Sequence, residues 1–276
     1  MSIKKNTLEQ LLPLSLTSTP AVSIRQENQV WVATAMLVHY LESFTDSLVV
    51  TNENEEPIGV IGGYEIIRNI FENPTSTLFD GKTVRELTDP ELLQITSKTN
   101  YQELLEKWEK TRRAFCIIQN QYGGYSAISA RKILEVAAKC KTNEKISDLP
   151  QKNLATFTSN TTVGHIINLM MENKSRKIIH SDLKHFISDR IIIQTIARDL
   201  NYLRQNENIL NMEVEEIFQL EKIKEIKEDL TISELAKIMF GMMHPYVLHK
   251  EQVYTPWDVC LGLLTENIMI DTNLKS

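Results

Sequence analysis

One transition recurs four times along the sequence: a short run rich in β-branched and aromatic residues passes directly into a segment with helical spacing of apolar residues. It falls at Gly62, Ser129, Ser188 and Thr255, in steps of 67 (129 − 62), 59 (188 − 129) and 67 (255 − 188) residues. Ahead of each transition the order is strand, helix, strand, turn and strand. Because one such unit cannot bury its apolar face alone, the copies must pack against each other. The sequence therefore predicts a repeat protein.

The alternating steps indicate that a pair of units has been duplicated. We expect one module over residues 1–141 and another over 142–276, with the polar residues 141–144 at the boundary. Each repeat mixes strands with helices, so the expected fold class is α/β in the α+β sense. The expected repeats are 1–80, which includes an extended N-terminal lead-in over 1–20, then 81–141, 142–205 and 206–276.

The fourth transition carries the most informative residues. The runs 246–248 and 252–254 flank a polar turn and predict a hairpin. Thr255 then suits the N-cap of a helix, and Pro256 suits its first position. Asp258 is placed where its carboxylate can accept an N–H group at the start of the helix. Capping is the commoner role of an isolated T-x-x-D pattern. The same pair could instead bind a ribose through the carboxylate and a phosphate through the hydroxyl, and both interpretations stay open.

Composition narrows the class of protein. Hydrophobic residues make up 42% and charged residues 24% of the chain, which is typical of a soluble globular protein. The net charge of −6 and the pI of about 5.6 argue against nucleic-acid binding. No apolar stretch approaches the length of a membrane span, so we expect no membrane association and a cytoplasmic location. Cys116, Cys140 and Cys260 are widely spaced and are expected to be reduced, mostly buried thiols.

Neither catalysis nor a metal site is expected. The sequence contains no G-x-S-x-G, P-loop, G-x-G-x-x-G or H-E-x-x-H motif, and its nine glycines leave few loops that could cradle a phosphate. His244 and His249 bracket one predicted strand, where residues five apart point to opposite faces. No ligand spacing is found among the remaining histidines, His39, His165, His180 and His185.

The repeated order, with a hairpin leading into T-x-x-D, resembles the CBS domain, named after cystathionine β-synthase. Residues 83–87 and 145–150 resemble the lead-in that often precedes such a repeat, and 58–61 resemble the G-φ-φ-T segment of the family. The resemblance covers nearly the whole chain. It implies four β-α-β-β-α repeats arranged as two pseudo-twofold Bateman modules, whose clefts bind adenosine-containing ligands.

The resemblance also implies roles for individual residues. In the fourth copy Asp258 would hold the ribose, Thr255 would approach the phosphate, and His244 would be the candidate basic residue. Thr158, from the partner repeat, would lie next to the adenine base. Arg176 precedes a hairpin where the family places phosphate-contacting bases, although a solvated helix end is the simpler explanation of its charge.

The other three copies depart from this pattern. The first copy keeps a carboxylate, Glu65, but has Gly62 in place of the hydroxyl residue, so it is a possible second site. Lys132 and Ile191 stand at the acidic position of the second and third copies. Neither can accept hydrogen bonds from ribose hydroxyls, and we expect both clefts to be silent.

These expectations combine into a non-catalytic regulatory protein. It would bind AMP, ADP, ATP or S-adenosylmethionine as a regulatory ligand in the second module, need no cofactor, and signal to an unidentified protein. A homodimer is expected, because equivalent helices in this family often form a dimerisation face. The alternative is a dimeric interaction scaffold that binds no nucleotide and whose clefts have decayed.

Overall fold

The computed structural model describes residues 3–39, 47–199, 203, 209–265 and 269–270. Contacts within the chain define two compact units. The first unit comprises Met1–Ala21, Leu93–Lys152 and Lys224–Ser276, and the second comprises Val22–Leu92 and Asn153–Ile223. Each unit therefore combines two non-consecutive repeats, so the expectation that 1–141 and 142–276 are the two compact parts is wrong. The repeat boundary expected at 205/206 lies outside the described residues. The segments 83–87, 145–150 and 209–222, expected to open the following repeats, instead share a unit with the preceding repeat and are assigned to that repeat.

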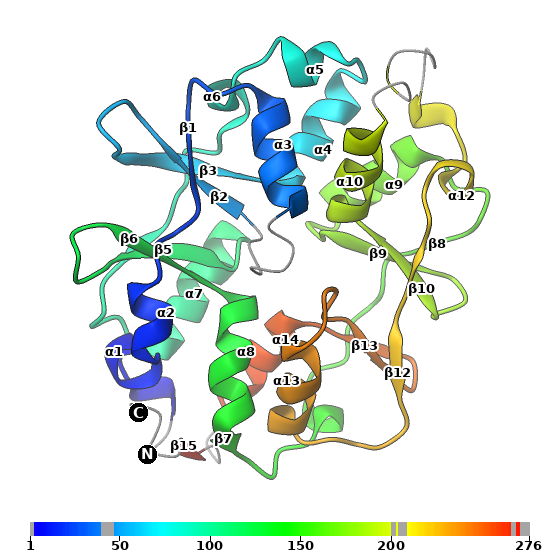
Figure 1. The fold of residues 1–276 in the computed structure, drawn as a ribbon. Helices are drawn as coiled ribbons and strands as arrows, with labels where there is room; N and C mark the ends of the chain where they lie inside the picture. The colour runs from blue at the N-terminus through cyan, green and yellow to red at the C-terminus, as the bar shows by residue number, and fades with distance from the viewer. Residues whose placement is uncertain (1–2, 40–46, 200–202, 204–208, 266–268, 271–276) are drawn as a thin grey trace. The chain divides into compact units, whose positions relative to one another are not determined.

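The first repeat, in the second unit, forms a three-stranded sheet in the order β1-β2-β3 (Figure 1). β1 is parallel to β2, and β2 is antiparallel to β3. Gly59 in β3 is required by a close approach, since a Cβ atom there would lie 2.6 Å from the carbonyl oxygen of Asp89. The elements are β1 (Ser23–Arg25), α3 (Val30–His39), β2 (Ser47–Thr51), β3 (Pro57–Gly62), α4 (Gly63–Glu72), α5 (Thr77–Asp80) and α6 (Val84–Leu87).

The third repeat completes the second unit with a sheet in the order β11-β10-β9-β8. The Thr162 hydroxyl caps α9 by accepting the His165 N–H at 3.3 Å, and Ser188 caps α10 by accepting the Ile191 N–H at 3.3 Å. The elements are β8 (Thr156–Phe157), α9 (Val163–Glu172), β9 (Lys177–His180), β10 (His185–Ser188), α10 (Asp189–Arg198), η3 (Ile209–Asn211), α12 (Val214–Ile217) and β11 (Glu221–Lys222).

The second repeat belongs to the first unit and has the sheet order β4-β5-β6. The side chain of Asn100 caps α7 by accepting the Glu103 N–H at 2.9 Å. The elements are β4 (Gln94–Ile95), α7 (Tyr101–Thr111), β5 (Phe115–Gln119), β6 (Tyr125–Ser129), α8 (Ala130–Lys139), β7 (Cys140–Lys141) and η2 (Ile146–Asp148).

The fourth repeat has the sheet order β12-β13-β14 and also lies in the first unit. Lys250, in the left-handed region with φ of 55°, makes the turn between β13 and β14. α13 begins at a capping box in which the Thr231 N–H and hydroxyl donate to the Glu234 carboxylate at 2.7 and 2.8 Å. The elements are β12 (Lys224–Ile226), α13 (Ile232–Phe240), β13 (Val247–His249), β14 (Gln252–Tyr254), α14 (Pro256–Gly262) and β15 (Met269–Ile270).

Helix packing explains why non-consecutive repeats share a unit. In the first unit α8 packs against α13 and α14, and in the second unit α10 packs against α3 and α4 (Figure 1). The helices that meet come from copies 126 residues apart, and both partners of each contact bury apolar side chains. The mixed helices and small mixed sheets confirm the α+β fold class.

Two segments differ from expectation. The lead-in is not extended where it is described: residues 3–20 contain η1 (Ile3–Lys5), α1 (Leu8–Leu11) and α2 (Leu14–Ser18), which pack on the second repeat through their leucines. The first strand expected in the fourth copy is instead two short strands, Glu221–Lys222 and Lys224–Ile226, separated at Ile223. β11 pairs with β10 of the third repeat, whereas β12 pairs with β13 of the fourth, so the chain changes sheets at this point.

No helix in the described part of the chain is both long and apolar enough to cross a bilayer.

All three cysteines are buried, free thiols. Burial raises the pKa of Cys140 to about 11 and the pKa of Cys260 to about 12, and it also raises the pKa of Cys116.

Since the thiolate is the reactive form of cysteine, we expect the native protein at pH 8 to react with a thiol reagent more than about tenfold more slowly than the urea-unfolded chain. The rate of absorbance change with a chromogenic disulfide measures this. Rapid labelling of one thiol in the native protein would contradict the burial described here.

Candidate functional site

The buried carboxylate of Asp258 is the centre of the predicted site. Its Oδ2 accepts the Thr255 N–H at 2.9 Å and the Thr255 hydroxyl at 2.7 Å, and the two residues are only 5% and 9% exposed. The first of these bonds is the capping contact expected at a helix start. Burial, followed by the Asp258 charge, raises the pKa of the neighbouring Tyr254. The capping contact predicted for Asp258 is therefore confirmed. It occupies one of the two carboxylate oxygens, Oδ2.

The second oxygen of Asp258 carries an ion pair that the sequence did not predict. The Lys152 ammonium contacts Asp258 Oδ1, and the backbone N–H of Lys152 donates to Gln252 Oε1 at 3.2 Å. The Lys152 side chain is 42% exposed, whereas the Asp258 side chain is 6% exposed. The lysine therefore compensates a buried charge while remaining accessible to solvent, which leaves it able to exchange its partner.

A buried arginine fixes the segment that precedes His244. Arg131, on α8, donates from Nη1 to the Met243 carbonyl at 2.6 Å and from Nη2 to the Met242 carbonyl. His244 follows directly, half-buried between α13 and β13, and lies in the same unit as Asp258. Arg131 comes from the second repeat, and nothing in the local pattern around it indicates this long-range contact.

Thr158 and Arg176, the other two residues predicted for this site, belong to the second unit. The Thr158 N–H donates to the Thr161 hydroxyl at 3.0 Å, in a turn between β8 and α9. Arg176 Nε donates to Asp189 Oδ2 at 2.6 Å, and Asp189 is 2% exposed. Within the first unit, the structure thus brings together Thr255, Asp258 and Lys152.

The first copy reproduces the backbone contact of the fourth. Glu65 Oε2 accepts the Gly62 N–H at 2.8 Å, as Asp258 accepts the Thr255 N–H, and Glu65 is 7% exposed. In the second copy, burial lowers the pKa of Lys132, whose ammonium donates to the Ala127 carbonyl at 2.8 Å. In the third copy Ile191 is buried. Glu65 and Asp258 therefore share one structural role, while Lys132 and Ile191 supply no acceptor there.

A pocket of about 300 Å³ lies in the second unit, lined among others by Trp31, Val38, Phe79 and Asp80. None of the predicted ligand residues lines it.

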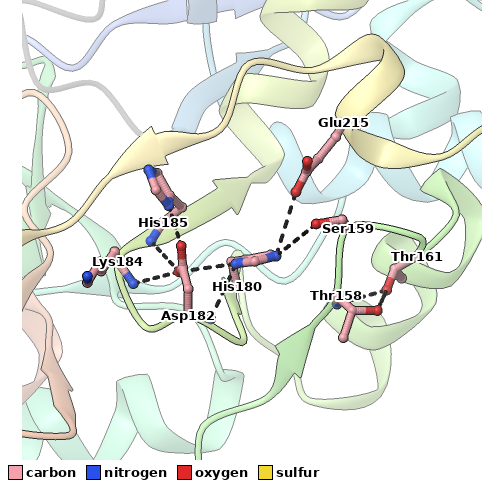
Figure 2. A network of polar contacts seen from close by, with 8 residues as sticks. All are labelled: Thr158, Ser159, Thr161, His180, Asp182, Lys184, His185 and Glu215. Atoms are coloured by element: carbon pink, nitrogen blue, oxygen red, sulfur yellow. Dashed lines mark hydrogen bonds and ion pairs between the residues drawn. The ribbon is translucent and has the colours of Figure 1, made fainter.

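A polar cluster on the β9–β10 hairpin was also missed by sequence reasoning (Figure 2). Asp182 accepts the backbone N–H groups of Lys184 and His185 at 2.7 and 3.1 Å, and its Oδ2 lies 2.6 Å from His185 Nδ1. Desolvation would raise the pKa of Asp182, but the hydrogen bonds from His185, Lys184 and His180 outweigh it and hold this pKa well below its usual range. The carboxylate is therefore a fixed negative charge at the turn.

Comparison with protein-family models and with curated proteins found no match to the sequence.

The fold, however, matches solved structures. A Methanocaldococcus jannaschii protein, proposed to be an archaeal homologue of g-AMPK, aligns over 90% of this chain and 98% of its own, with a TM-score of 0.73 and 19% identity. An uncharacterized conserved protein from Pyrococcus horikoshii aligns over 91% and 98%, with a TM-score of 0.54 and 12% identity. A CBS-domain containing protein from Agrobacterium tumefaciens aligns over 48% and 93%, with a TM-score of 0.40 and 11% identity. The chain has the fold of the CBS-domain proteins, as its four repeats predict.

Proposed function

We propose that this chain is a non-catalytic regulatory protein that binds an adenosine-containing ligand at Thr255 and Asp258 and signals to a partner protein. The observation that carries the proposal is the buried Asp258 carboxylate, held in position by two donors from Thr255. Orientation by these donors leaves Oδ1 directed at an exchangeable partner, Lys152. A carboxylate fixed in this way is suited to accept the vicinal hydroxyls of a ribose.

Binding would exchange one partner of Asp258 for another. The ribose hydroxyls would displace the Lys152 ammonium from Oδ1, and the half-exposed lysine would then be free to pair with the ligand phosphate. His244 is the second candidate for the phosphate charge. The exchange keeps the buried carboxylate hydrogen-bonded in both states, which burial requires.

The remaining site residues rest on the family resemblance. Thr158 and Arg176 belong to the second unit and are not assigned to the site at Asp258 in the first unit. Their roles in ligand binding stay predictions, as does a second site at Gly62 and Glu65. Arg176 already pairs with Asp189, so a phosphate would have to compete with that carboxylate. The M. jannaschii neighbour proposed as a homologue of g-AMPK supports a nucleotide as the ligand.

A thermal-shift panel tests the proposal. We expect AMP, ADP, ATP or S-adenosylmethionine, but not GTP, to raise the melting temperature, because a ligand bound only by the folded state stabilises it by mass action. A ligand at about 100 times its Kd would add about 2.7 kcal/mol. This stabilisation should vanish in Asp258→Ala.

The matched control is Glu234→Ala. Glu234 accepts from the Thr231 N–H and hydroxyl in the same way that Asp258 accepts from Thr255, but at the exposed start of α13. Glu234→Ala should lower the stability of the free protein, because a capping interaction is lost, and should leave the ligand-induced rise in melting temperature unchanged. An equal ligand response in the wild type and in Asp258→Ala would overturn the proposed site.

The nucleotide-free scaffold remains the second candidate function. Phe240, the last residue of α13, and Met243, in the segment that follows, are 41% and 54% exposed, and such apolar side chains suit an interaction surface. If no adenosyl ligand shifts the melting temperature, the scaffold becomes the better account. The homodimer expected in either case can be measured by light scattering during size-exclusion chromatography.

A further inference from the structure

His180 and His185 face each other across the β9–β10 hairpin. In this antiparallel pair Phe186 lies opposite Ile179, which places His185 opposite His180 at the end of the ladder. Their ring centroids are 6.5 Å apart. Spacing along the sequence does not reveal this pair, because the tight turn between the strands brings the rings together.

A carboxylate lies between the two rings. Asp182 Oδ1 is 3.1 Å from His180 Nδ1, and Asp182 Oδ2 is 2.6 Å from His185 Nδ1. One potential ligand atom from each residue lies within 4.8 Å of the other two. Figure 2 shows the three side chains converging on one point beside the hairpin. Two imidazoles and a carboxylate are therefore assembled on one rigid turn.

Surrounding residues set the orientation of these donors. Asp182 is held by the backbone N–H groups of the turn, and the edge of the Phe157 ring packs against His180 with centroids 5.1 Å apart. His180 Nε2 faces the Ser159 hydroxyl at 3.4 Å and a Glu215 carboxylate oxygen at 3.6 Å. The Ser159 and Glu215 oxygens are hydrogen-bond acceptors facing Nε2, which favours the tautomer with the N–H on Nε2 and the lone pair on Nδ1.

That tautomer directs a lone pair towards a negative charge. His180 Nδ1 accepts the Asp182 N–H at 3.3 Å and lies 3.1 Å from Asp182 Oδ1, so an ion bound there would take over the lone pair and release this long hydrogen bond to solvent. A cation between the two groups would stabilise this arrangement. Glu215 lies 3.6 Å from Nε2, close enough for a small shift to form the carboxylate–histidine hydrogen bond that orients metal-binding imidazoles.

We propose that His180, Asp182 and His185 bind one divalent transition-metal ion of the zinc class. Imidazole and carboxylate donors suit zinc and its neighbours, whereas calcium and magnesium prefer sites built of oxygen alone. The side chains are 14%, 34% and 31% exposed, so the ion has access and a water can complete the coordination. The ion would link the hairpin through His180 to Ser159 and Glu215, and so stabilise this part of the second unit.

The test is a calorimetric titration of Zn²⁺ into the full chain, freed of metal by a chelator and carrying no histidine tag. We expect one ion per chain, a raised melting temperature, and binding weakened at least tenfold in His180→Ala and in His185→Ala. Asp182→Asn should also weaken binding while keeping the acceptor oxygen that the turn requires. His165→Ala, an exposed histidine on α9, is the matched control and should bind as the wild type does.

A hydrogen bond between His185 Nδ1 and Asp182 Oδ2 would account for the cluster without any metal. In that case Zn²⁺ gives no saturable heat, or the three variants bind it as the wild type does, and the proposed site is wrong. Circular dichroism of each variant establishes that a loss of binding is not a loss of fold.

Discussion

Replacing Trp108 by alanine is expected to lower the free energy of unfolding by about 3 to 5 kcal/mol. Trp108 lies on α7, is 1% exposed, and is among the largest fully buried side chains. Its ring lies 6.4 Å from the ring of Trp257, the residue immediately before Asp258. Removing the Trp108 ring would leave a cavity beneath the start of α14. The lost stability therefore combines the transfer free energy of the ring with the van der Waals contacts of its neighbours. Urea unfolding followed by circular dichroism measures it.

Trp31→Ala is the matched control for this change. Trp31 is 49% exposed on α3, so its removal should cost less than about 1 kcal/mol. Equal effects of the two substitutions would show that Trp108 does not occupy the core described here. Because Trp108 supports Trp257, we also expect Trp108→Ala to weaken any ligand bound at Asp258.

Replacing Arg176 by methionine is expected to destabilise the protein by about 1 to 3 kcal/mol. The substitution removes the guanidinium that pairs with Asp189, whose side chain is 3% exposed. A buried carboxylate without its ionic partner is costly, although the 39% exposure of Arg176 screens the pair and reduces the effect. Asp189 also lies close to Gly63, where an added Cβ would be 2.7 Å from its Cγ, so the carboxylate has little room to move.

A double-mutant cycle separates the charge from the packing. Arg176→Met combined with Asp189→Asn should restore part of the lost stability, because the uncompensated charge is then gone. Arg68→Met is the control, since Arg68 pairs with Glu72 at 3.0 Å with both side chains more than half exposed, and its loss should cost under about 1 kcal/mol. If Arg176→Met is no more destabilising than Arg68→Met, Asp189 does not depend on Arg176.

Local sequence patterns predicted the elements of each repeat well. The strand Gln252–Tyr254 begins and ends where expected, Thr255 occupies the N-cap position of α14, and Asp258 accepts the Thr255 N–H as its position suggested. These features depend on the spacing of apolar residues and on turn and capping residues that lie within a few positions of one another. A single sequence displays both.

Contacts between distant residues could not be predicted in the same way. Lys152 and Asp258 are 106 residues apart, and Arg131 and Met242 are 111 apart, so no local pattern links them. The compact units depend on which helix faces match, and the interruption at Ile223 depends on which sheet each end of the segment joins. The histidine pair appears only once the register of the hairpin is known.

Direct titration of an adenosyl ligand is the measurement that tests the central claim. Calorimetry with the ligand that most stabilises the wild type should give saturable binding, and Asp258→Asn should weaken it at least tenfold, since the neutral amide keeps an acceptor for the Thr255 N–H but loses the charge that favours ribose hydroxyls. Lys152→Met should weaken AMP more than adenosine. Binding of equal strength in the wild type and in Asp258→Asn, or no binding by the wild type at millimolar ligand, would contradict a nucleotide sensor built on Asp258.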